Sequence, residues 1–352
     1  MYNMFRIKEN RDNSRCHQQV RNTSGATLRA IAMSALLAVA TTSAAQSTGN
    51  RHVRKPKAAA TATTQTYTYT GPRIQIGHHP YRCSLVGTVK GMTGEGFQGM
   101  AVHGNYVVSL QNSGICNIST YDGNTLKQLA TYKLASNNRV NHSNVAAFGT
   151  EKADAADPMP VLYVSQAARE PYNGRKDVCF VERLGMDKST TVQTIYLDDA
   201  DKIFGYALQW TVDRFNNLLI GYGNTVNNDA PDNRHAVIIF RLPKLSEGRD
   251  VTLRREQAID FFYIEDSHNV NLNPLIGQGL CVSNDRLFMP TGFGTAERPS
   301  IMYVVGLTTH RLENAIDMTR STKNELEDCD VYNDEYILLQ TVKGDIYRVE
   351  FQ

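Results

Sequence analysis

The sequence predicts an all-β fold, a five-bladed β-propeller built from four-stranded blades. A strand motif led by a polar residue recurs five times between residues 98 and 339. In four copies the next strand begins about nine residues after that leading residue. One strand, at about 83–89, stands before the first copy without a partner, and the last copy stops one strand short. Repeats of roughly 45–70 residues with several strands each are typical of propellers.

The first strand of each copy begins at an amide or a carboxylate, and most copies continue through a tight turn. The five leading residues are Gln98, Asn144, Gln209, Gln278 and Glu327. The turns carry Gly104-Asn105, Asn216-Asn217, Asn284-Asp285 and Asn333-Asp334. Because these residue types tolerate a left-handed backbone, they favour two-residue hairpins.

Two more strands follow in most copies, and alternating apolar and β-branched residues support them. We expect third strands at 115–121, 178–184, 236–242, 301–307 and 346–351. We expect fourth strands at 128–134, 192–197, 257–262 and 313–318. No convincing amphipathic helix is predicted.

The missing fourth strand of the last blade is supplied by the strand at about 83–89. This pairing closes the array into a ring and removes exposed sheet edges. The alternative, a β-sandwich of two domains, explains neither the regular spacing of the leading residues nor the unpaired first strand.

The chain begins with a segment typical of a secretory signal peptide, residues 1–45. Arg21 and Arg29 precede an apolar run at 31–40, and Ser43-Ala44-Ala45 fits a cleavage site near Ala45. The apolar run is too short to cross a bilayer as a transmembrane helix. We therefore expect a secreted protein, either periplasmic or extracellular.

Residues 46–75 predict a flexible linker, basic at first and then rich in Ala and Thr, and residues 76–352 a single propeller domain. Without residues 1–45, which carry six Lys/Arg and two Asp/Glu, the chain has 31 basic and 33 acidic residues, a formal charge of −2. Four further basic residues lie in 51–57. The propeller is thus acidic, which argues against a nucleic-acid partner.

Five cysteines remain after the leader, and each lies in a predicted strand among apolar residues: Cys83, Cys116, Cys179, Cys281 and Cys329. Export permits disulfides, but an odd number leaves at least one thiol free. Buried free thiols are the favoured interpretation. No spacing typical of a zinc site is present.

The chain resembles secreted bacterial β-propellers of the broad TolB-like and quinoprotein-like grouping over about residues 76–352. The resemblance rests on the blade pattern and on two stretches, Gln-Gly-Met-Ala-Val at 98–102 and Leu-Glu-Asp-Cys-Asp-Val-Tyr-Asn at 326–333. It implies the propeller fold. The resemblance identifies no catalytic residue in this chain.

In a propeller the first strands line the central channel, so the five leading residues should meet at its mouth on one face. Such convergence of polar groups predicts a ligand site, although solvation of a water-filled channel is an alternative. Long loops on the same face add three candidates, Tyr172, Arg175 and His268, and His142, two residues before Asn144, is a fourth that could join the ring of leading residues. By strand alternation Asp328 should point into a blade interface, and Trp210 should pack between blades two and three.

Three functions stay open. The first is a binding module, a monomer that holds a polar small molecule, glycan or peptide at the mouth. The second is a hydrolase or lyase in which Glu327 acts as acid or base, with a weakly held calcium ion as the one cofactor considered. The third is an assembly scaffold, which predicts an exposed apolar patch.

Overall fold

The computed structural model describes residues 81–93, 95–168, 170–226, 230, 232–264 and 277–351. All of these belong to one compact unit, Thr61–Gln352. The predicted signal peptide, the predicted linker and His268 lie outside the described residues. Among the described residues no helix is long and apolar enough to cross a membrane.

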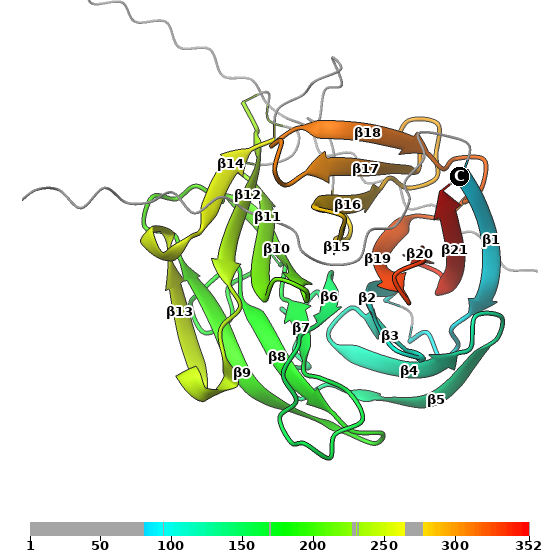
Figure 1. The fold of residues 1–352 in the computed structure, drawn as a ribbon, viewed down its shortest axis with the longest axis horizontal. Helices are drawn as coiled ribbons and strands as arrows, with labels where there is room; N and C mark the ends of the chain where they lie inside the picture. Colours follow the sequence, from blue (N-terminus) through cyan, green and yellow to red (C-terminus); the bar gives the residue numbers. More distant parts are fainter. Residues whose placement is uncertain are drawn as a thin grey trace, which may run out of the picture. The chain divides into compact units, whose positions relative to one another are not determined.

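Five antiparallel sheets surround a central axis, which confirms the predicted five-bladed propeller (Figure 1). Blade 1 contains β2 (Phe97–His103), β3 (Tyr106–Gln111), β4 (Ile115–Tyr121) and β5 (Leu126–Lys133). Blade 2 contains β6 (Ala146–Phe148), β7 (Leu162–Ser165), β8 (Cys179–Leu184) and β9 (Ser189–Asp198). Blade 3 contains β10 (Tyr206–Asp213), β11 (Leu218–Asn224), β12 (His235–Arg241) and β14 (Asp260–Tyr263).

Blade 4 contains β15 (Cys281–Ser283), β16 (Arg286–Thr291), β17 (Ile301–Gly306) and β18 (Leu312–Asp317). Blade 5 contains β19 (Leu326–Tyr332), β20 (Tyr336–Thr341), β21 (Asp345–Phe351) and β1 (Tyr81–Thr88). The innermost strands contact one another in the order β2, β6, β10, β15, β19 and back to β2. The ring is therefore closed.

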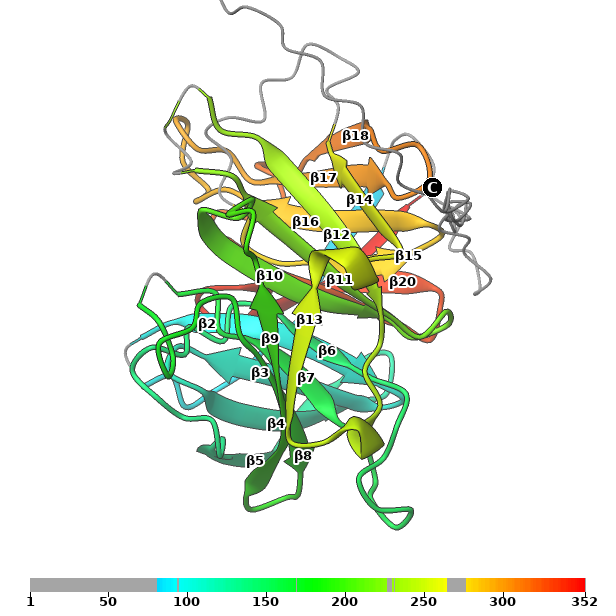
Figure 2. The same cartoon turned by 90° about the vertical axis from the view of Figure 1, so that its left-hand side faces the viewer.

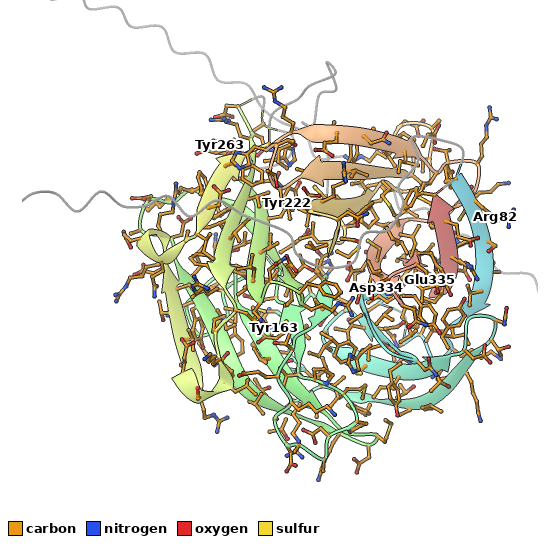
Figure 3. All side chains as sticks on the ribbon, viewed as in Figure 1. Arg82, Tyr163, Tyr222, Tyr263, Asp334 and Glu335 are labelled. Carbon is orange, nitrogen blue, oxygen red and sulfur yellow. The ribbon has the colours of Figure 1, made fainter. Side chains whose placement is uncertain are left out.

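The closure by the N-terminal strand is confirmed. β1 pairs antiparallel with β21, with Tyr81 opposite Phe351 and Cys83 opposite Val349. In Figure 1, β1 forms the outer edge of the last blade, and Figure 3 shows Arg82 extending outward from that edge. The first described strand and the last strand of the chain thus share one sheet.

Blade 2 has a fifth strand that we did not predict. β13 (Asp250–Arg254) pairs in parallel with β9 (Figure 2). Two short 3-10 helices flank it, η1 (Leu245–Glu247) and η2 (Arg255–Gln257). Because η2 occupies the start of the segment expected to be the fourth strand of blade 3, β14 begins only at Asp260.

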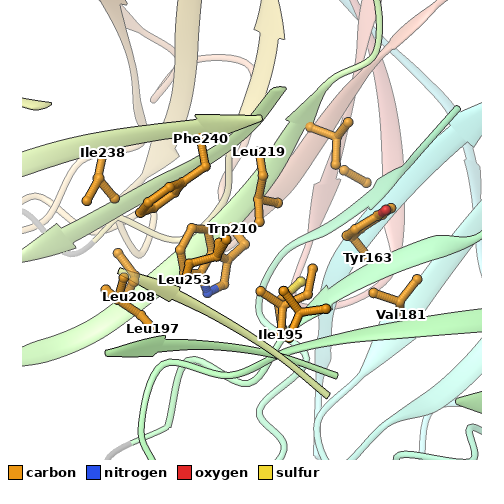
Figure 4. Close-up of a cluster of buried hydrophobic side chains, with 14 of the residues drawn as sticks. Tyr163, Val181, Ile195, Leu197, Leu208, Trp210, Leu219, Ile238, Phe240 and Leu253 are labelled. Atoms are coloured by element: carbon orange, nitrogen blue, oxygen red, sulfur yellow. The ribbon is translucent and has the colours of Figure 1, made fainter. Parts of the chain in front are cut away.

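The core lies between the blades, and Trp210 illustrates it. The indole is fully buried among side chains of blade 2, such as Tyr163 and Val181, and of blade 3, such as Phe240 (Figure 4). Its Nε1 donates a hydrogen bond to the carbonyl of Asp177 at 2.9 Å. The expected position of Trp210 between blades two and three is confirmed, and packing with a satisfied N–H explains it.

Candidate functional site

The five leading side chains lie in the first half of the inner strands or up to three residues before them, and all are buried. Their exposed fractions are between 1 and 6%. They form pairs rather than one uninterrupted ring. Gln98 Nε2 donates to Glu327 Oε1 at 3.2 Å, which joins blades 1 and 5. Gln209 Nε2 donates to Asn144 Oδ1, which joins blades 3 and 2, and to the carbonyl of Gly277 at 2.7 Å.

The remaining leading residue, Gln278, meets a carboxylate that we did not predict from the sequence. Gln278 Nε2 donates to Glu325 Oε1 at 2.5 Å. Glu325 lies two residues before Glu327, so the two-residue period of a strand could have placed both on one side. The mouth thus holds two carboxylates and four amides. We use the term mouth for these six residues: Gln98, Asn144, Gln209, Gln278, Glu325 and Glu327.

Hydrogen-bond acceptors outnumber donors in the mouth. Three buried oxygens have no hydrogen-bond partner among the described residues: Gln98 Oε1, Gln209 Oε1 and Glu327 Oε2. The orientation of the two amides follows from their partners, since each Nε2 already faces an oxygen. Buried acceptors without donors are costly, so these atoms favour a bound group that donates hydrogen bonds or carries positive charge.

The carboxylates of the mouth titrate abnormally. Burial raises the pKa of Glu327 well above its ordinary value, and the charges of Glu325 and Asp328 raise it further, while the hydrogen bond from Gln98 lowers it. Burial also raises the pKa of Glu325, against the hydrogen bond from Gln278. Burial of these two carboxylates therefore disfavours negative charge in the mouth, and a cationic group would stabilise their ionised forms.

Beneath the mouth, the Asp328 carboxylate joins four blades. It accepts backbone N–H groups from Met100 at 2.8 Å and from Ala146, Leu280 and Cys329 at 2.9 Å each. These donors belong to blades 1, 2, 4 and 5. Burial raises the pKa of Asp328, and the four N–H groups lower it. Since all four partners donate, their geometry fits the ionised carboxylate.

The expected orientation of Asp328, into a blade interface, holds only in part, because its carboxylate bonds the neighbouring blades 1 and 4 and also reaches blade 2. The pairing of β19 with β20 shifts register between Leu326 and Cys329, as at a β-bulge. Register shifts also occur between Phe97 and Met100 in β2 and between residues 206 and 209 in β10. A bulge breaks the side-chain alternation on which the expectation depended, and it redirects side chains. Three leading residues thus lie at or within bulges.

Two glycines beside the leading glutamines allow the inner strands to meet. A Cβ atom at Gly279 would lie 2.3 Å from the carbonyl oxygen of Glu327 and 2.4 Å from the Cα atom of Asp328. A Cβ atom at Gly99 would lie 2.7 Å from the carbonyl oxygen of Ser143. The Gln-Gly pairs therefore combine a mouth side chain with a close backbone approach.

Two residues after Asp328, Asp330 forms an ion pair with Arg214 that also joins inner strands. Asp330 accepts the backbone N–H of Val102 at 2.7 Å and an Nη2–H of Arg214 at 3.0 Å. Arg214 also donates to the carbonyl of Val102 at 3.2 Å. Blades 1, 3 and 5 are joined there. The mouth residues are therefore polar, and the neighbouring Asp328 and Asp330 carboxylates are charged or hydrogen-bonded groups that join the inner strands.

The remaining predicted loop residues have other contacts. His142 Nδ1 lies 3.2 Å from Asn112 Oδ1, and burial lowers the pKa of His142. Tyr172 packs edge-on against Phe180 of β8 at 4.9 Å. The Arg175 guanidinium stacks on the Tyr196 ring of β9 at 4.4 Å, and its Nη1 donates to Thr252 of β13. These contacts fix Tyr172 and Arg175 on the outer part of blade 2.

Among the described residues, no group of three or more His, Cys, Asp or Glu side chains is arranged to hold a metal ion. The side-chain oxygens of the mouth are four from amides and four from the two carboxylates. A cation there would be held by Glu327, Glu325 and amide oxygens together, a donor set that suits calcium better than zinc.

No protein-family model matches the chain, and no characterised protein matches it in sequence. The solved structures similar in fold include the following three. The tail fibre of Staphylococcus aureus phage P68 has a TM-score of 0.47 and 10% identity over 76% of this chain and 52% of its own, so the chain spans about half of it. Myxococcus xanthus glutaminyl cyclase has a TM-score of 0.44 and 11% identity over 76% of this chain and 95% of its own.

A glucose dehydrogenase has a TM-score of 0.41 and 10% identity over 77% of this chain and 99% of its own. At these TM-scores the similarities carry no argument about function. The strand pairing places the chain in the broad β-propeller grouping, and the site has to be argued from its own residues.

Proposed function

We propose that this propeller binds a polar ligand, a glycan or a peptide segment, at the mouth through a group that donates hydrogen bonds or carries positive charge. One observation carries the proposal: three buried oxygens, on Gln98, Gln209 and Glu327, lack donors among the described residues. An ammonium group offers three N–H donors and one positive charge. It would therefore satisfy acceptors and offset the repulsion between Glu325 and Glu327.

The rigidity of the site supports this proposal. Each leading side chain is held by a neighbouring blade, and Asp328 fixes the inner strands of blades 1, 2, 4 and 5. A preformed site loses little conformational entropy on binding, so few contacts suffice for measurable affinity. The long loops that the sequence predicts on the same face would add contacts for a polymeric ligand.

The proposal is tested by thermal unfolding of the full chain with paired probes. The glycan pair is the chitosan pentamer and its fully N-acetylated counterpart, and the peptide pair is triglycine with a free or an acetylated N-terminus. A ligand that binds only the folded state raises the melting temperature by mass action. We expect the amine-bearing member of at least one pair to raise it more than the acetylated member. Equal or absent shifts for both pairs would contradict the proposal.

Calcium is a separate arm of the same experiment. We expect millimolar calcium to compete with the amine-bearing probe if both use Glu327, and Glu327→Gln should weaken both. Glu335→Gln, which removes an exposed carboxylate at the β19–β20 turn, is the matched control.

A second candidate is a hydrolase or lyase, and it is favoured by the raised pKa of Glu327. A carboxyl group whose pKa is raised keeps its proton to higher pH and can act as a general acid, and Glu325 is a second carboxylate in the same mouth. Under this hypothesis Glu327→Gln abolishes turnover of a glycan or peptide substrate while the fold persists. Turnover that survives in that variant would exclude Glu327 as the acid.

A further inference from the structure

Two of the five cysteines in the propeller face each other across a blade boundary. Cys281 lies in β15, the inner strand of blade 4, and Cys329 lies in β19, the inner strand of blade 5. Their Sγ atoms are 3.3 Å apart. Both side chains are buried, with exposed fractions of 2% and 0%. The contact joins residues 48 positions apart in the sequence.

The backbones at this boundary are close enough for a covalent bridge. Two residues before Cys281, a Cβ atom at Gly279 would lie 2.4 Å from the Cα atom of Asp328, the residue before Cys329. Asp328 Oδ1 accepts the N–H groups of both Leu280 and Cys329. One carboxylate oxygen thus holds the residue beside Cys281 and the backbone of Cys329 itself. A disulfide requires such a close approach of the two backbones, and here hydrogen bonds maintain it.

We propose that Cys281 and Cys329 form a disulfide that joins blade 4 to blade 5 when the chain folds in the presence of a disulfide donor. The other three cysteines, Cys83, Cys116 and Cys179, lie on strands of blades 5, 1 and 2. The odd number of cysteines is thereby explained by one pair and three thiols.

The chemistry is thiol–disulfide exchange, with oxidised glutathione as the donor. The thiolate of one cysteine attacks a sulfur of the donor, breaks its S–S bond and releases one glutathione thiolate. The thiolate of the second cysteine then attacks the mixed disulfide, forms the Cys281–Cys329 bond and releases the second glutathione. The two thiol protons end on the two reduced glutathione molecules, and the two cysteines are oxidised as the donor is reduced.

Burial determines when this exchange occurs. Burial raises the pKa of Cys281, and burial together with the neighbouring Cys281 raises the pKa of Cys329 well above its ordinary value. Thiolates are therefore scarce in the folded protein, and the exchange is fast only while the strands are still accessible. Once formed, the bond is shielded from reductants.

The first test is a peptide map. The full chain is reduced, denatured, refolded with oxidised and reduced glutathione, and digested with trypsin without reduction. We expect mass spectrometry to detect peptides 256–286 and 324–343 joined by a disulfide, since each contains one cysteine of the pair. Recovery of both peptides only as free thiols, or joined to other cysteines, would overturn the proposal.

The second test measures what reduction does to stability. We expect dithiothreitol during refolding to lower the melting temperature of the wild-type chain by about 5–10 °C, since the bond closes a long loop. Cys329→Ala should show no such dependence, and Cys281→Ala serves if that variant fails to fold. Cys116→Ala, a buried thiol outside the pair, should keep it. A wild-type melting temperature that is the same with and without reductant would overturn the proposal.

Discussion

The Asp328 carboxylate of the last blade and the backbone N–H of Met100 in the first blade are 2.8 Å apart. This hydrogen bond spans the point where the ring closes, at the inner strands. At the outer edge of the last blade, the ring is closed by backbone pairing of the first described strand, β1, with the last strand, β21. The propeller is therefore closed twice, by a sheet at its rim and by a carboxylate at its axis.

Asp328→Asn should destabilise the fold strongly. The amide keeps the shape but places an NH₂ group against backbone N–H donors, so at least one buried donor loses its acceptor. We expect a loss of about 3 kcal/mol or more in the free energy of unfolding, measured by urea denaturation. Asp334→Asn, at an exposed turn of the same blade, is the matched control and should change it little. Equal stability of the two variants would show that Asp328 does not hold the axis.

Gly279→Ala should disrupt the boundary between blades 4 and 5. The new Cβ atom would meet the backbone of Glu327 and Asp328 at 2.3–2.4 Å, and backbone cannot move aside as a flexible side chain can. Gly104→Ala is the control, because its Cβ atom meets nothing within 4 Å and only its left-handed backbone, with φ of +52°, is strained. We expect a much lower melting temperature for the first variant than for the second. The reverse order would refute the close approach.

The stability of the chain should decrease as the pH rises through the titration of Glu327. Its folded pKa is raised, so the folded state holds a proton at pH values where the unfolded chain has released it. This contribution is fully present below the ordinary pKa of a glutamate and is lost as the pH rises towards the folded pKa. Glu327→Gln should flatten this part of a melting-temperature series from pH 4 to 8, whereas Glu335→Gln should not.

Asp177 should add a second, separable pH dependence. Burial raises its pKa to about 6 against the hydrogen bond from the Leu208 N–H. Stability should fall between about pH 4 and pH 6 by at most ~3 kcal/mol, because the folded state holds the proton longer than the unfolded chain does. Asp177→Asn keeps an acceptor for Leu208 and tolerates the positive φ of 62° at this position. It should lose that dependence, and Asp201→Asn, at an exposed position, should keep it.

The blade plan was predictable from the sequence because it rests on local signals. Polar leading residues, Asn and Gly turns and apolar alternation recur with each blade, and the partner of the strand at 83–89 followed from counting strands. The position of Asp328 was not predictable in this way, since a bulge in β19 breaks the alternation that strand patterns assume. Bulges in several inner strands carry no residue signature of their own.

The pairing of strands that are distant in the sequence could not be predicted either. β13 joins blade 2 in parallel although three strands of blade 3, β10 to β12, lie between β9 and β13 in the chain, and the local sequence pattern does not specify such a partner. The proximity of the leading residues was expected, but their division into pairs and the contribution of Glu325 depend on side-chain contacts between blades. From the sequence we expected Tyr172 and Arg175 on a loop of the face that carries the leading residues. In the structure, their contacts with the aromatic rings of Phe180 and Tyr196 hold them against blade 2.

The central claim is that the mouth binds a donor group through the buried acceptors around Glu327. Isothermal titration of the chitosan pentamer and of triglycine, each against its acetylated counterpart, into the wild-type chain and Glu327→Gln tests it most directly. We predict tighter binding of at least one free amine than of its acetylated counterpart, by tenfold or more, and loss of this preference in Glu327→Gln. Equal affinities within both pairs, or a preference for the amine that survives in Glu327→Gln, would contradict the account.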